Sequence, residues 1–209
     1  MTNADYTAIK VVMDRSGSMD YIRQDAEGAL RSFIKEQVTV PGKATIALAQ
    51  FDTVYEDVYA SVDIKDAPDF KLKPRGGTAL NDAIGRSVQE FGSELAAMPE
   101  DERPGNVIVV IITDGEENSS HEYSVKAVKA LIERQQNEYN WNFIFLAANQ
   151  DAVLTGSTYG FGINSSVTFN TNPDSLLGVS SVLNAYTTST RSGIVYEISD
   201  DDRDATAQK

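Results

Sequence analysis

The sequence predicts an α/β protein with a doubly wound, mostly parallel central sheet and helices on both faces. Two observations predict this fold class. Short, strongly apolar segments alternate along the chain with longer segments in which apolar residues recur every three or four positions. The most apolar segment, 107–112, contains only valine and isoleucine, which is typical of a strand buried on both faces of a parallel sheet. The chain has 209 residues, of which 41% are hydrophobic, and this is enough for one such domain.

The apolar runs and the periodic segments place the elements in order. The strands at 45–51 and 54–59 are separated by so short a gap that we expect a hairpin, with 54–59 as an antiparallel strand at one edge of the sheet. Strands are expected at 8–13, 45–51, 54–59, 107–112, 142–147, 167–169 and 193–198. Helices are expected at 22–37, 78–95, 125–135 and 174–186, with a short one beginning at 149–151. Together these elements predict a Rossmann-like sheet with right-handed crossovers.

One domain is expected at residues 6–190. Residues 1–5 are mostly polar and should be loose. Residues 191–209 form a C-terminal extension, in which 193–198 should add an edge strand and 200–209 a charged, poorly ordered acidic tail.

The chain is acidic and lacks cysteine. It carries 18 Lys and Arg against 31 Asp and Glu, a net charge of −13, which argues against nucleic acid or an anionic membrane as the main partner. The absence of cysteine excludes disulfides and zinc–sulfur sites and favours a reducing compartment. The first six residues do not resemble a signal peptide, and no apolar run is long enough to span a membrane. We therefore expect a cytoplasmic protein, whose oligomeric state stays open.

The first strand leads directly into three oxygen-bearing side chains at alternate positions, Asp14, Ser16 and Ser18. A turn after a strand can bring these side chains together, and Gly17 relieves the backbone where the turn is tight. Oxygen ligands without sulfur or imidazole suit a hard cation such as Mg²⁺. The stretch therefore predicts part of a metal site.

Two later segments extend this pattern. They are Gly76-Gly77-Thr78-Ala79-Leu80 and the buried strand 107–112, which is followed by Thr113-Asp114-Gly115. With the Asp-x-Ser-x-Ser stretch, they resemble the intact metal-ion-dependent adhesion site (MIDAS) of the von Willebrand factor A (vWA) family. The resemblance covers roughly residues 6–186.

The resemblance implies a ligand set and a function. The hydroxyls of Ser16, Ser18 and Thr78 would hold Mg²⁺, with Mn²⁺ or Ca²⁺ as possible substitutes, and Asp14 and Asp114 would act directly or through water. Neutral hydroxyls leave most of the metal charge uncompensated, and an octahedral shell leaves a position to water. An Asp or Glu of a partner protein can displace that water. The implied function is a Mg²⁺-dependent protein-interaction module.

Three further residues are candidates for contact with such a partner. Arg15 and Arg75 flank the expected site and could bind the same carboxylate, although each could instead form a surface salt bridge. Asn149 follows the strand 142–147 on the same rim of the sheet and could line the site.

Other functions fit the sequence less well, and we do not expect an enzyme. A Mg²⁺-dependent phosphohydrolase with Asp14 as nucleophile would need a second acid two residues on, where the chain has Ser16. His121 is the only histidine and is expected to be exposed near a helix start, and no Gly-x-Ser-x-Gly motif is present. A remaining alternative is a structural or regulatory subunit of a larger intracellular machine, in which bound metal stabilises the fold alone.

Overall fold

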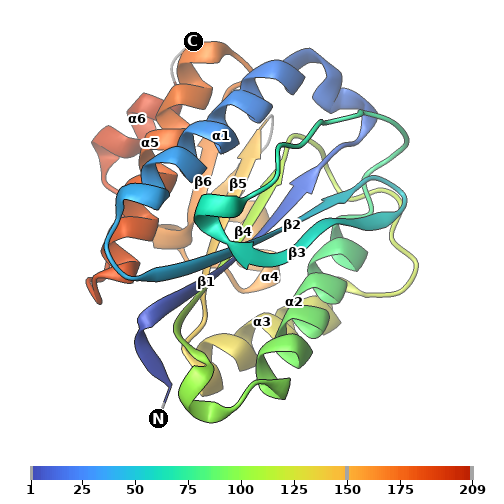
Figure 1. Cartoon of the computed structure of the whole chain (residues 1–209). Coiled ribbons are helices and arrows are strands. Elements are labelled where there is room, and N and C mark those ends of the chain that lie inside the picture. The colour runs from blue at the N-terminus through green and yellow to red at the C-terminus, as the bar shows by residue number, and fades with distance from the viewer. Residues whose placement is uncertain (1, 149–150, 208–209) are drawn as a thin grey trace.

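The structure, a computed structural model, describes residues 2–148 and 151–207 and contains a six-stranded sheet with helices on both faces (Figure 1). The strand order is β3-β2-β1-β4-β5-β6, and every neighbouring pair is parallel except the antiparallel β2–β3. The fold class predicted from the sequence is therefore confirmed, including the antiparallel strand at one edge. The strands are β1 (Asn3–Asp14), β2 (Lys43–Phe51), β3 (Tyr55–Asp63), β4 (Pro104–Thr113), β5 (Asn142–Ala148) and β6 (Ser166–Phe169).

The helices divide into two layers. One layer, formed by α1 and α5, packs on one face of the sheet, and the second, formed by α2, α3 and α4, packs on the other. The described helices are α1 (Arg23–Thr39), α2 (Leu80–Ala97), α3 (Val125–Tyr139), α4 (Ala152–Tyr159), α5 (Pro173–Arg191) and α6 (Asp200–Thr206). Within the described part of the chain, no helix combines the length and the apolar character needed to cross a membrane.

The side chains of β1 alternate between the two faces of the sheet, so this strand packs against both layers of helices. Ile9, Val11 and Met13 point into the core beneath α1 and α5, whereas Ala8 and Val12 point into the core beneath α2 and α3. All five are fully buried. Apolar residues on both faces of a strand are therefore the expected product of a sheet covered on both faces.

The register of β1 and β4 positions the candidate site. The two strands are parallel neighbours, with Met13 opposite Ile112. Both strands therefore end at the same edge of the sheet, and the residues that follow them, up to Asp114, come together there.

The two ends of the chain differ from the prediction. Asn3 already belongs to β1, because its backbone N–H donates to the carbonyl of Arg103 (2.8 Å), so the expected loose N-terminus is wrong from residue 3 onward. No strand forms at 193–198; Ile194 and Val195 are 62% and 86% exposed. The segment instead packs the ring of Tyr196 against Tyr186 of α5 and leads into α6.

The expected disordered tail is also wrong over the residues described, because 200–206 form α6. Ser199 and Asp202 make a reciprocal capping box, and three aspartates in the first turn complement the helix dipole. The carbonyl of Thr206 accepts hydrogen bonds from Asn170 N–H and from the hydroxyl of Ser175, which fixes α6 against the start of α5.

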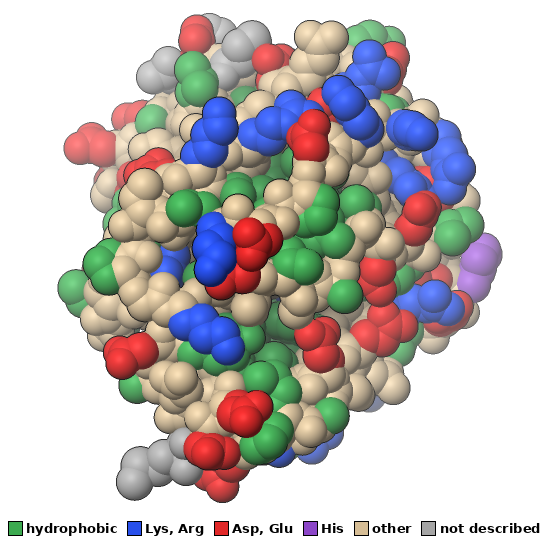
Figure 2. Space-filling model, viewed as in Figure 1, with side chains coloured by type: hydrophobic (Ala, Val, Ile, Leu, Met, Phe, Trp, Pro, Cys, Tyr) green, Lys and Arg blue, Asp and Glu red, His purple; other side chains and the backbone are tan. Residues whose placement is uncertain are grey.

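On the face in Figure 2, Lys and Arg side chains gather along the upper right, although the chain as a whole is acidic.

Candidate functional site

The side chain of Asp14 is fixed at the carboxyl end of β1. It is fully buried, and each carboxylate oxygen accepts one short hydrogen bond. Oδ1 accepts from the backbone N–H of Ser16 (2.6 Å), and Oδ2 accepts from the hydroxyl of Thr113 at the end of β4 (2.6 Å). Asp14 therefore ties the turn after β1 to the neighbouring strand.

The two serines of the same turn lie next to Asp114. Ser16 Oγ and Ser18 Oγ are 3.2 Å apart, and Ser18 Oγ donates to Asp114 Oδ1 (2.8 Å). Ser16 is buried, whereas Ser18 lies at the surface. The turn thus brings two hydroxyls from one loop against a carboxylate from another.

Thr78 reaches the same place on the loop before α2. The carbonyl of Gly76 accepts from Gly17 N–H (3.2 Å), which holds this loop against the turn after β1. The position of Gly115 shows how closely the hydroxyls converge: a Cβ built there would lie 3.1 Å from Thr78 Oγ1, 3.8 Å from Ser18 Oγ and 3.9 Å from Ser16 Oγ. The structure therefore brings together all five residues predicted as a metal site, namely Asp14, Ser16, Ser18, Thr78 and Asp114.

Burial raises the pKa of both carboxylates of the site in the metal-free protein. It raises the pKa of Asp14 from its ordinary 3.8 to about 6, although hydrogen bonds from Thr113 and Ser16 oppose the rise. Burial also raises the pKa of Asp114, opposed by the hydrogen bond from Ser18. In the described part of the chain, Asp14 forms no ion pair with a Lys or Arg. A cation at this point would supply the missing positive charge.

The donor set fits a hard cation that is held mainly by oxygen. Within residues 2–148 and 151–207, no group of three or more His, Cys, Asp and Glu side chains is arranged to hold a metal ion. Any metal at this site would therefore depend on the hydroxyls of Ser16, Ser18 and Thr78 together with the two carboxylates. Oxygen ligands of this kind suit Mg²⁺, Mn²⁺ or Ca²⁺ better than soft metals.

Asp52, which the sequence did not single out, joins the loops of the site. Its buried carboxylate oxygen Oδ2 accepts from Arg15 Nε (2.9 Å) and Arg75 Nε (2.7 Å), and its carbonyl accepts from Ala79 N–H (2.9 Å). Despite its burial, these arginines and the N–H of Val54 hold the pKa of Asp52 below its ordinary value. Its only sequence signal is its place directly after β2, at the same edge of the sheet.

Asn118 is a second residue that the sequence did not single out. Its side-chain oxygen accepts from Thr78 N–H (2.9 Å), and its own N–H donates to the Thr78 carbonyl (3.0 Å). Glu117 accepts from the N–H of Asn81 at the start of α2 (2.8 Å), so the loop after β4 is fixed to that helix. These contacts hold Thr78 against the loop that carries Asp114.

The three candidates for partner contact have different outcomes. Arg15 is buried and paired with Asp52 and with Glu56 (2.7 Å), an arrangement that favours a structural ion pair over contact with a partner. Arg75 also pairs with Asp52, but its side chain is 61% exposed and remains accessible. Asn149 lies outside the described residues.

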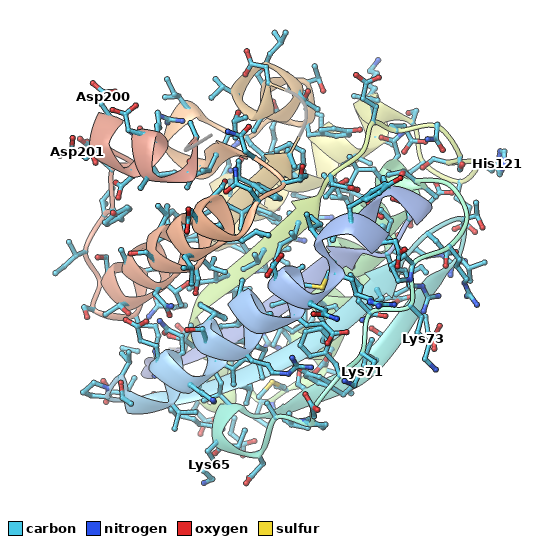
Figure 3. The ribbon with its side chains drawn as sticks, turned by 90° about the horizontal axis from the view of Figure 1, so that it is seen from above. Lys65, Lys71, Lys73, His121, Asp200 and Asp201 are labelled. Carbon is cyan, nitrogen blue, oxygen red and sulfur yellow. The ribbon has the colours of Figure 1, made fainter. Side chains whose placement is uncertain are left out.

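His121 is placed as the sequence predicted. Its side chain is exposed and points away from the protein (Figure 3), while its backbone N–H donates to Asp82 Oδ2 (2.8 Å). Among the residues that the structure describes, its side chain therefore does not pair with a buried nucleophile.

No known family model matches this sequence, and no curated protein matches it. Its fold is nevertheless similar to those of solved vWA structures. Proximal thread matrix protein 1 from the mussel byssus has a TM-score of 0.63 and 17% identity, over 87% of this chain and 48% of its own. A second structure of that protein, described with a zinc-occupied MIDAS motif, has a TM-score of 0.63 and 14% identity, over 88% of this chain and 46% of its own.

A von Willebrand factor type A protein from Catenulispora acidiphila has a TM-score of 0.59 and 16% identity, over 87% of this chain and 42% of its own. The chain thus spans less than half the length of each of these proteins. Identities this low establish the fold alone. On that basis, the chain has the fold of von Willebrand factor A domains.

Proposed function

We propose that this chain is a protein-interaction module that holds a divalent cation, most simply Mg²⁺, and uses it to bind an Asp or Glu of a partner protein. The observation that carries the proposal is the convergence of three hydroxyls on two buried carboxylates at the carboxyl edge of the sheet. Ser16, Ser18 and Thr78 would hold the cation through oxygen, with Asp14 and Asp114 balancing its charge.

The charge balance supports a role in carboxylate binding. The three hydroxyls are neutral, so a divalent cation that they hold directly, with Asp14 and Asp114 acting through water, keeps an attraction for an additional anion. The cation would supply this attraction, and the loops of the protein would orient the partner's carboxylate. Ser18 is exposed, so the site is open to a partner on that side.

The surroundings of Asp14 support a binding role over catalysis. A nucleophilic carboxylate needs a free oxygen that faces the substrate, whereas both oxygens of Asp14 accept hydrogen bonds and the side chain is fully buried. Position 16, where a phosphohydrolase of this layout would need an acid, is a serine. The mussel protein with a zinc-occupied MIDAS supports metal binding by a domain of this fold.

The proposal is tested by capturing partners from a cell lysate on the immobilised protein, with Mg²⁺ or with EDTA. Thr78→Val removes one hydroxyl and keeps the shape of the side chain. The matched control is Thr158→Val, which removes an exposed hydroxyl on α4. We expect a protein that is captured in Mg²⁺ by the wild type and the control, and lost in EDTA and with Thr78→Val. Equal capture under all four conditions would refute the proposal.

A further inference from the structure

The segment of residues 71–75, here called the basic segment, runs from α1 to the candidate metal site. At one end, the N–H of Leu72 donates to Glu27 on α1 (2.8 Å). At the other end, the N–H of Arg75 donates to the carbonyl of Arg15 (2.8 Å) in the turn after β1. The chain then continues through two glycines to Thr78. The basic segment is thus fixed to the protein at both ends and leads directly into the site.

Its side chains alternate between the core and solvent. Leu72 is 2% exposed, whereas Lys71 and Arg75 are 70% and 61% exposed in their side chains. Lys73 is also exposed and makes no hydrogen bond or ion pair with the residues that the structure describes. Figure 3 labels Lys71 and Lys73 on the same side of the molecule. The alternation therefore presents three cationic side chains to solvent, at positions 71, 73 and 75.

The anions near the basic segment are buried or already paired with arginines. Asp52 is buried beneath Arg75, and the side chain of Glu27, 4.0 Å from Lys71, is only 8% exposed. Asp69 and Glu56 are exposed but pair with Arg31 (2.8 Å) and Arg15 (2.7 Å). Cationic groups therefore dominate the exposed part of this surface, along the upper right of Figure 2, in a chain with a net charge of −13.

We propose that the basic segment binds an acidic stretch of the partner, whose first carboxylate occupies the metal site and whose neighbouring Asp or Glu residues lie along Lys71, Lys73 and Arg75. This inference rests on the proposed function and specifies the partner as an acidic peptide segment. Screening at physiological salt limits the reach of surface charges to about 8 Å, so a peptide residue that lies along the basic segment is influenced mainly by Lys71, Lys73 and Arg75.

Two synthetic peptides of equal length test the inference by fluorescence anisotropy. One has a single Glu in a Gly-Ser chain, and the other has the same Glu flanked on both sides by Asp. In Mg²⁺ we expect the Asp-rich peptide to bind about tenfold more tightly, as for a few exposed ion pairs, with a difference that shrinks as NaCl is added. The double substitution Lys71→Ala and Lys73→Ala should remove most of this difference.

The matched control removes two exposed lysines elsewhere, Lys35→Ala on α1 and Lys126→Ala on α3. It changes the net charge equally and should keep the preference for the Asp-rich peptide. Equal Mg²⁺-dependent affinity for both peptides, or a preference that survives in the Lys71/Lys73 variant, would overturn this inference and leave the proposed function intact. If neither peptide shows Mg²⁺-dependent binding, the proposed function fails and the inference fails with it.

Discussion

Ser18 and Asp114 are 96 positions apart in the chain, yet the hydroxyl of Ser18 donates to Asp114 Oδ1 at 2.8 Å. The bond joins the turn after β1 to the loop after β4. Because these strands are parallel neighbours, their carboxyl ends meet. The site is therefore a product of the folded sheet, and no single stretch of sequence contains it.

Replacing Asp114 with Asn tests its role as a charge that balances a cation. Because burial raises the pKa of Asp114, the neutral amide should leave the metal-free protein at least as stable as the wild type. The loss of one negative charge should weaken Mg²⁺ binding by about tenfold or more, since even groups that act behind the ligands change metal affinity by about 10- to 100-fold. Calorimetry measures the affinity and thermal melting in EDTA measures the stability. Unchanged Mg²⁺ affinity would show that Asp114 is not part of the metal site.

The raised pKa of Asp14 predicts a pH dependence of stability. The folded protein holds this proton up to about pH 6, whereas the unfolded chain loses it near 3.8, so the free energy of unfolding of the metal-free protein should fall as pH rises from about 4 to 6. A shift of this size corresponds to about 3 kcal/mol. Mg²⁺ competes with the proton, so its affinity should rise over the same range and level off above pH 6.

Urea denaturation in EDTA between pH 4 and 7 measures this effect, with Asp14→Asn as the comparison. The variant cannot titrate at this position, so the part of the pH dependence that comes from Asp14 should be missing from it. Identical pH profiles for the two proteins would show that Asp14 titrates normally.

Gly115→Ala should block the site with little effect on the fold. The added Cβ would lie 3.1 Å from Thr78 Oγ1, close to the point on which the three hydroxyls converge. We expect a loss of Mg²⁺ affinity and a melting temperature in EDTA within a few degrees of the wild type. Gly28→Ala on α1 is the control, because the Cβ it would add has no described atom within 4 Å other than its chain neighbours and the backbone of its own helix. Full Mg²⁺ affinity in Gly115→Ala would mean that the metal lies elsewhere.

Asp52→Asn should destabilise the protein because it leaves the buried Arg15 without its inner partner. Removal of one partner of a buried ion pair costs about 3 kcal/mol or more. The same substitution breaks the ion pair between Asp52 and Arg75, which holds the loop that leads to Thr78. Mg²⁺ affinity should therefore fall as well. Glu138→Gln, which breaks the exposed pair with Arg134 on α3, should change the free energy of unfolding by less than about 1 kcal/mol. Equal effects of the two substitutions in urea denaturation would contradict the role given to Asp52.

Local periodicity was sufficient to predict most of the fold. Ile9, Val11 and Met13 lie on one face of the first strand and Ala8 and Val12 on the other, which predicts a strand buried on both sides, and the structure contains it. The prediction failed at Ile194 and Val195, which have strand-like side chains but no strand beside them. The capping box of Ser199 and Asp202 was the local signal for the helix that forms instead.

The candidate site was predictable only in part. Asp14, Ser16 and Ser18 are close in sequence, so their convergence follows from a single turn. Asp52 and Asn118 act through contacts with residues 23 to 40 positions away, and no spacing rule marks such contacts. The burial of Arg15 likewise depends on its pairing with Asp52, 37 positions along the chain.

The most direct test of the central claim is a calorimetric titration of Mg²⁺ into metal-stripped protein, with the wild type, Thr78→Val and Thr158→Val side by side. The account predicts saturable binding at one site in the wild type and in Thr158→Val, and a large loss of affinity in Thr78→Val. Absence of binding in the wild type, or equal binding in all three proteins, would contradict a metal site formed by Asp14, Ser16, Ser18, Thr78 and Asp114.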